Sequence, residues 1–152
     1  MITVENISLL QGSFELKGID LELNAGEYGV LMGSSGCGKT TVLEAICGLR
    51  KINAGCITLG KRDVTSLPPA ERGVGYVPQD RALFPTLIVR EQLAFALILR
   101  KLSQEDIAAR VAELAKLLGI THLLDRDPEN LSGGEAQRVA LGRALAHRPD
   151  VL

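Results

Sequence analysis

A glycine-rich segment from Gly33 to Thr40 limits the possible folds more than any other feature of the chain. Its letters, GSSGCGKT, match the phosphate-loop pattern G-x-x-x-x-G-K-[ST] at every fixed position. An apolar run at 28–32 precedes the segment, and apolar residues recur at helical spacing after Lys39, with Gly48 at the expected helix end. The segment therefore joins a predicted buried strand to a predicted helix, the context of a phosphate-binding loop in an α/β fold.

The composition of this loop suits a nucleoside triphosphate. Glycines at 33, 36 and 38 let the backbone approach the phosphates, and the helix that starts near Lys39 adds its positive end. Lys39 should reach the β- and γ-phosphates, and the Thr40 hydroxyl should bind Mg²⁺. Cys37 could react with oxidants, although a small residue that merely fits the loop is the simpler reading. The expected phosphate-binding residues are Gly33, Ser34, Ser35, Gly36, Cys37, Gly38, Lys39, Thr40 and Thr41.

Hydrophobic spacing predicts the remaining elements. Alternation at 14–17 and 19–24 predicts antiparallel strands ahead of the loop, and further strands are expected at 56–59 and 74–77. Helical spacing begins after Ser103, a candidate N-cap, and stops at Gly119. A last helix is expected at about 134–147. We divide the chain into a nucleotide-binding core at 1–80, a helical subdomain at 81–132, and a final helix with the start of a strand at 133–152.

Composition excludes several classes of function. The chain has 152 residues, a net charge of −1, 3% aromatic residues and no tryptophan, so neither a basic face nor aromatic platforms for nucleic acid are expected. Three cysteines without C-x-x-C spacing argue against a disulfide framework or a zinc site. The N-terminus is unlike a signal peptide, and no apolar run is long enough to span a membrane. Work at a membrane would therefore require a partner.

A second motif, LSGGEAQR at 131–138, is more specific for function than the loop. Ser132 and Glu135 form the S-x-x-E pattern of a helix capping box, and Gly133 and Gly134 leave the first backbone N–H groups open to an anion. A well-capped helix alone would explain this segment equally well. Between the two motifs lies VPQD at 77–80, whose Gln79 could otherwise be a residue in a solvated turn.

These three motifs in this order resemble the ATP-binding-cassette (ABC) ATPases, the engine subunits of ABC transporters. The resemblance implies a RecA-like P-loop NTPase core with N-terminal antiparallel strands and an inserted helical subdomain. It implies ATP and Mg²⁺ as ligands, with Thr40 and Gln79 at the metal and Gln79 also at the attacking water. The signature residues that would act across a head-to-tail dimer are Ser132, Gly133, Gly134, Glu135 and Gln137.

The resemblance also implies partners and a location. A second ATPase subunit and transmembrane permease subunits would bind directly, a solute-binding protein would act indirectly, and no nucleic acid is expected. The subunit would be cytoplasmic and peripheral on the inner face of the membrane. Residues 83–87 resemble the surface that receives a helix of the membrane subunit, although Phe84 could equally close the domain's own core.

The chain departs from the family pattern at three places. Leu10 and Gln11 stand where an aromatic residue usually stacks on adenine, and the alternation of Phe14 favours a core position for it. Ser34 replaces a proline found in many importers, with little effect expected. The sequence stops at Leu152, where the Walker B aspartate and the catalytic glutamate would follow. We therefore expect a chain incomplete at its C-terminus that hydrolyses ATP poorly alone.

Details at 63–69 and 75–79 look most like bacterial and archaeal importers, with the molybdate/tungstate-like oxyanion subunits nearest. Two rivals stay open: a non-hydrolysing nucleotide-binding fragment, and a soluble ABC ATPase outside transport. The second would normally carry a long insertion or two cassettes, and neither is seen. A kinase or small GTPase would leave 132–138 unexplained.

Overall fold

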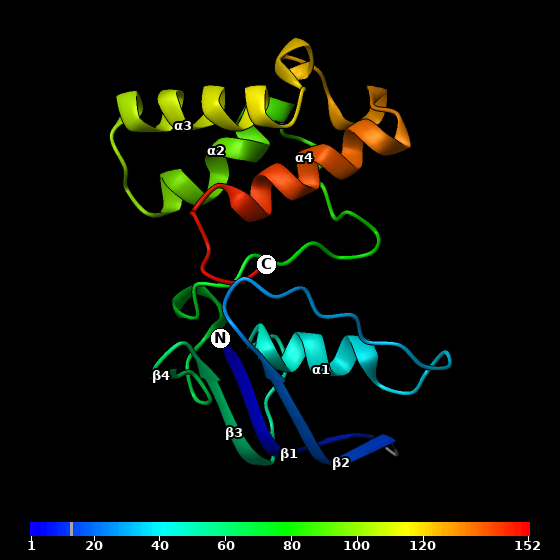
Figure 1. Cartoon of the computed structure of the whole chain (residues 1–152). Helices are drawn as coiled ribbons and strands as arrows, with labels where there is room; N and C mark the ends of the chain where they lie inside the picture. The colour runs from blue at the N-terminus through cyan, green and yellow to red at the C-terminus, as the bar shows by residue number, and fades with distance from the viewer. Residues whose placement is uncertain (13) are drawn as a thin grey trace. The chain divides into compact units, whose positions relative to one another are not determined.

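The computed structural model describes residues 1–12 and 14–152, which form two compact units at 1–72 and 73–152 (Figure 1). Each unit has buried apolar residues of its own. Unit 1 combines a sheet with one helix, and unit 2 is helical. The two units are described separately.

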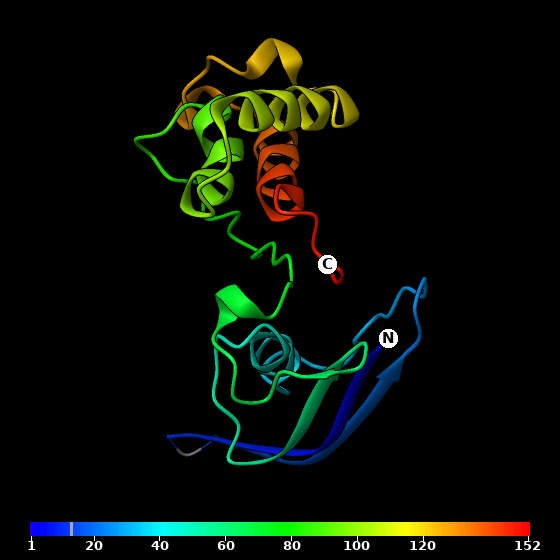
Figure 2. The same ribbon diagram turned by 90° about the vertical axis from the view of Figure 1, so that its left-hand side faces the viewer.

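A four-stranded antiparallel sheet forms most of unit 1, in the order β2-β1-β3-β4. Its strands are β1 (Ile2–Gln11), β2 (Phe14–Leu23), β3 (Ala54–Leu59) and β4 (Arg62–Asp63). Along β2, half-buried residues alternate with exposed ones for most of the strand, so the predicted strands at 14–17 and 19–24 are confirmed. Helix α1 (Lys39–Ile46) lies over one face of the sheet (Figure 2) and buries Val42, Ala45 and Ile46.

Two predicted strands are wrong in this structure. Residues 28–32 form no strand, and Tyr28, Val30 and Met32 are 91%, 62% and 87% exposed. Residues 74–77 contribute only an isolated parallel bridge between Val74 and Val151. A strand exists through backbone bonds to a neighbour, and no described residue supplies a full neighbour for either run. Apolar sequence predicts that a segment can be buried in a sheet, but not that its pairing partner is present.

Three helices build unit 2: α2 (Val89–Leu99), α3 (Gln104–Leu117) and α4 (Gly133–Leu145). The short 3₁₀ turns are Pro69–Glu71 in unit 1, and Thr121–Leu123 and Pro128–Asn130 in unit 2. The Ser103 side chain accepts from the Asp106 amide, and Gly119 follows α3 at φ 65°, so both predicted ends of this helix are confirmed. The core joins all three helices through Leu93, Leu114 and Val139, each fully buried.

Helices α2 and α4 approach each other closely at a glycine. A Cβ built on Gly142 would lie 2.5 Å from Leu93 Cδ2 and 3.0 Å from Leu118 Cδ1. Real Cβ contacts are longer than this, so the absence of a side chain at 142 permits the crossing. The glycine costs α4 about 1 kcal/mol of helix propensity, which the buried contact offsets.

Candidate functional site

The predicted phosphate loop spans 33–41 at the start of α1 in unit 1. Gly36 and Gly38 have φ of 80° and 100°, a left-handed region that favours glycine. A Cβ on Gly38 would lie 2.8 Å from Leu16 of β2, whereas nothing lies within 4 Å of the position of a Cβ on Gly36. Gly38 is therefore needed to seat the loop on the sheet, and Gly36 leaves open space above it.

Lys39 lies half-buried at the centre of this loop. Its ammonium donates to the Gly33 carbonyl at 2.9 Å and to the Ser34 carbonyl at 2.7 Å, and the Cys37 sulfur lies 3.6 Å away. Thr40 is exposed in the first turn of α1. The loop thus gathers a lysine cation, glycine backbone and a helix N-terminus, a combination that fits a phosphate chain.

Arg72 holds the other end of α1, and sequence reasoning missed it. Its buried guanidinium donates to the carbonyls of Ala45 and Ile46 at 2.8 and 3.0 Å, and also to those of Leu67 and Thr65. The C-terminal carbonyls of a helix need partners outside the helix, and Arg72 supplies them. No sequence signal finds this role, because the acceptors are backbone groups.

A cavity of about 260 Å³ in unit 1 reaches from the strands to Thr41, the last residue of the predicted loop. Leu10 and Phe14 line it from the strand side, and Thr41 lines it from α1. Phe14 also approaches Gly38, since a Cβ there would lie 3.1 Å from its ring. The side chain of Gln11, the other predicted position for adenine, lies outside the described residues. Phe14 is half-buried between this cavity and the loop, in partial agreement with the core position expected for it.

The three cysteines differ in environment. Cys37 is exposed in the loop, Cys47 is buried and Cys56 is intermediate, and all three are free. Burial raises the pKa of the Cys47 thiol to about 11, opposed by the nearby Arg72 cation. Cys47 is therefore an inert core residue, and Cys37 is the accessible thiol of the loop.

Gln79 and Asp80 belong to unit 2 and are exposed. The sequence left two roles open for Phe84, contact with a membrane subunit and closure of the domain's own core. In the structure Phe84 packs within unit 2. Its ring centroid is 4.8 Å from that of Phe95, and the Arg143 guanidinium lies 4.2 Å over it. Pro85 and Thr86 are left exposed at the tip of this segment.

The signature residues lie at the N-terminus of α4, also in unit 2. The Ser132 amide donates to Glu135 at 2.7 Å, and the Glu135 amide donates to the Ser132 hydroxyl at 3.4 Å, so the predicted capping box is confirmed. These bonds with Ser132 hold the pKa of Glu135 below its usual value. Ser132, Gly133 and Gly134 are exposed, and the space around a Cβ on Gly134 is empty. Gln137 is exposed one turn further on.

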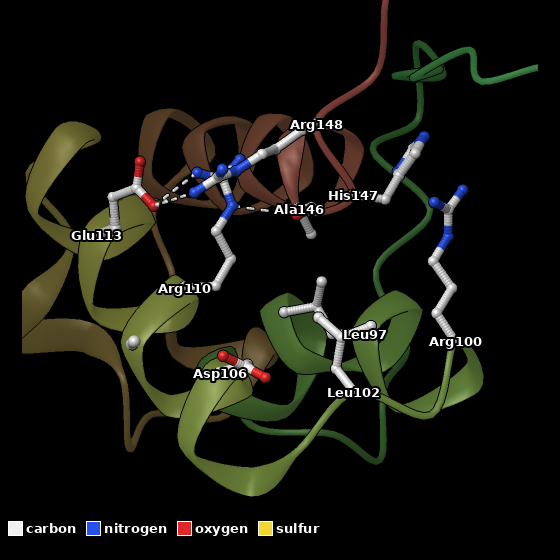
Figure 3. Close-up of a pocket in the computed structure, with 10 residues that line it drawn as sticks. Leu97, Arg100, Leu102, Asp106, Arg110, Glu113, Ala146, His147 and Arg148 are labelled. Carbon is white, nitrogen blue, oxygen red and sulfur yellow. Dashed lines mark hydrogen bonds and ion pairs between the residues drawn. The ribbon is translucent and has the colours of Figure 1, made fainter.

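Unit 2 has a cavity of its own, of about 390 Å³, whose lining includes none of the predicted site residues (Figure 3). At its rim Arg110 and Arg148 both pair with Glu113, and Arg110 also donates to the carbonyls of Leu145 and Ala146 at the end of α4. Figure 3 shows His147 and Arg100 on the opposite side of the cavity. Burial lowers the pKa of His147, and Arg100 lowers it further. Arg110 thus supplies donors to backbone carbonyls at the C-terminal end of α4.

No helix within the described ranges 1–12 and 14–152 is long and apolar enough to cross a membrane. Among those same residues, no group of three or more His, Cys, Asp and Glu side chains is placed to hold a metal ion.

Comparisons with known proteins agree with this geometry. A family profile described as ABC transporter matches residues 16–152. The molybdate/tungstate import ATP-binding protein of Thermococcus kodakarensis is 45% identical over all of this chain and 46% of its own length. The sulfoquinovosyl glycerol transport ATP-binding protein of Agrobacterium fabrum is 52% identical over 90% of this chain and 38% of its own. The chain thus spans about half the length, or less, of these curated relatives.

Solved structures show the same fold. The dimeric structure of MJ0796, a bacterial ABC transporter cassette, matches with a TM-score of 0.84 at 31% identity, over 98% of this chain and 71% of that one. A post-hydrolysis structure of the same cassette, bound to ADP and Pi, also has a TM-score of 0.84. The predicted α/β cassette fold is confirmed. Given the family profile, the relatives and the shared fold, this chain belongs to the ABC transporter family of ATP-binding proteins.

Proposed function

We propose that this chain is the ATP-binding part of an ABC import system and binds Mg-ATP through residues 33–41. The observation that carries the proposal is the loop itself, with the Lys39 ammonium held over glycine backbone at the N-terminus of α1. A β- or γ-phosphate would take over some of the donors that Lys39 now gives to Gly33 and Ser34. Thr40 and Gln79 would bind Mg²⁺, and Gln79 would also orient the attacking water.

The assembled protein would hydrolyse ATP as a head-to-tail dimer, in which Ser132, Gly133, Gly134, Glu135 and Gln137 face the nucleotide of the partner subunit. Permease subunits at the cytoplasmic face of the membrane would contact residues 83–87, and a solute-binding protein would act through them. The functional division at 1–80, 81–132 and 133–152 belongs to the same proposal. Slow turnover by the 152 residues alone stays a prediction, which phosphate release would check.

The transported solute is proposed to be a small oxyanion. A relative named for molybdate and tungstate import matches the whole chain. Relatives named for sulfoquinovosyl glycerol and for sn-glycerol-3-phosphate match 90% and 88% of it, so organic solutes are the second candidate. Uptake assays with the assembled system, comparing molybdate with glycerol phosphate, would separate the two classes.

Lys39→Ala tests nucleotide binding directly. Removing a charge-assisted contact should weaken ATP binding by about 2–3 kcal/mol, measured by calorimetry in Mg²⁺. Lys17→Ala is the control, because that lysine is exposed on β2 and, within the described part of the chain, forms its ion pair with the neighbouring Glu15. Equal ATP affinity for the Lys39→Ala variant and the unaltered chain would refute the proposal.

A further inference from the structure

The cavity of about 390 Å³ in unit 2 has an apolar floor (Figure 3). Leu97 of α2 and Ala146, which follows α4, are 2% and 1% exposed. Leu102 and Ala109 extend this apolar lining toward solvent. Sites for small molecules start at about 300 Å³ and combine an apolar wall with a few polar groups. The cavity therefore has the size and the floor of a small-molecule site.

Both carboxylates of the cavity lining already have partners within unit 2. Glu113 pairs with Arg110 at 2.8 Å and with Arg148 at 3.3 Å. The Asp106 carboxylate accepts from the Ser103 hydroxyl at 2.6 Å, in the first turn of α3. The negative groups of the cavity are therefore engaged by side chains of unit 2 itself.

Arg100, the residue that follows α2, is the cation of the lining without such a partner. Within residues 1–12 and 14–152, no carboxylate forms an ion pair with its guanidinium. Burial first, and the Arg100 cation second, lower the pKa of His147, and among the described residues no carboxylate raises it. Three arginines and two carboxylates give the lining a net positive charge. Arg100 therefore presents an uncompensated positive charge at the side of the cavity that it shares with His147.

We propose that this cavity binds a small aliphatic carboxylate, whose oxygens pair with Arg100 and whose carbon chain lies on Leu97 and Leu102. The parallel donors of a guanidinium fit the two oxygens of a carboxylate. A carbon chain that covers the apolar floor leaves water, which favours binding in proportion to the area covered. No predicted nucleotide, metal or signature residue lines the cavity, so the site goes beyond the proposed function.

Hexanoate is the probe, added to the 152-residue chain at constant ionic strength and followed by NMR. The methyl signals of Leu97 and Leu102 and the Nε signal of Arg100 should shift together and saturate in the millimolar range or below. Hexanamide keeps the carbon chain and loses the charge, whereas acetate keeps the charge and loses most of the carbon chain. Each should bind at least about tenfold more weakly, because each lacks one of the two contacts. Shifts that do not saturate, or a hexanoate affinity equal to that of hexanamide or of acetate, would overturn the proposal.

Two variants separate the site from a general change in structure. Arg100→Gln should weaken hexanoate binding about tenfold and leave hexanamide binding nearly unchanged, because only the charge pair is lost. Leu102→Ala should weaken hexanoate and hexanamide by the same factor and leave acetate unchanged, because only apolar contact is lost. Arg90→Gln is the control, since this arginine of α2 pairs with the exposed Asp125 and lies outside the lining. Unaltered hexanoate affinity in either Arg100→Gln or Leu102→Ala, or a loss in Arg90→Gln as large as in Arg100→Gln, would contradict the assignment of the site.

Discussion

Single residues fix both ends of α1 and the predicted phosphate loop at its start. Lys39 anchors the loop by donating to its carbonyls, and Arg72 completes the hydrogen bonds of the helix end. The contiguous motif predicted that Lys39 belongs to this loop, because spacing alone fixes which residues share it, whereas its bonds to the Gly33 and Ser34 carbonyls were not predicted. Arg72 was not predictable, because it binds backbone carbonyls of a helix distant in sequence and no residue type marks such an acceptor.

Arg72→Met should destabilise the chain by about 2–4 kcal/mol, because the carbonyls of Ala45 and Ile46 would lose their donors in a buried site. Urea unfolding followed by circular dichroism measures the change. Arg62→Met provides the comparison: this exposed arginine donates to a single carbonyl, that of Glu71, and its loss should cost well under 1 kcal/mol. Equal losses in the two variants would contradict the role of Arg72 as the cap of α1.

At the scale of elements, local sequence patterns predicted those helices and strands that depend on contacts between residues close in sequence. The amphipathic period and the capping residues placed α3 and α4 within a few residues, and alternation placed β2. The prediction of a strand at 28–32 was wrong because a strand forms only by bonding to a neighbouring strand, which can lie far away in the sequence. The apolar pattern of that run carries no information on whether the neighbour is there to bond.

The open end of α4 leads to a prediction on the signature. Gly134→Asp should leave ATP binding by a single subunit almost unchanged, since the proposed function places Gly134 at the nucleotide of the partner subunit and not at the one held by Lys39. It should prevent ATP-driven association of two subunits, because its carboxylate would face the γ-phosphate of the partner. Calorimetry and light scattering with ATP measure the two effects. A loss of ATP affinity as large as that of Lys39→Ala would contradict action across the dimer.

For the whole molecule, stability should depend on pH through groups in both units. Asp63 in unit 1 and Glu113 and Glu135 in unit 2 have lowered pKa values, mainly from hydrogen bonds, so their contributions are lost only in strong acid. His147 differs, because burial first and Arg100 second lower its pKa below 6.5. Above that pH it is neutral in both states. As the pH falls, the unfolded chain takes up the proton first, so stability falls.

His147→Gln should therefore flatten the pH dependence of the unfolding free energy between about pH 7 and pH 5. Urea unfolding at several pH values, for the variant and the unaltered chain, gives the comparison. The decline below about pH 4 should persist in both, since carboxylates cause it. An unaltered slope near pH 6 in the variant would show that His147 does not titrate differently in the folded chain.

The crossing of α2 and α4 has room for one large side chain, and Leu93 occupies it against Gly142. Gly142→Ala should destabilise unit 2 although alanine favours helices, and Leu93→Ala should do so by leaving a cavity. Together the two changes move volume from one helix to the other, so their combined cost should be smaller than the sum of the separate costs. Over evolutionary time, positions 93 and 142 should therefore change in concert. Relatives with a side chain at 142 should carry a smaller residue at 93.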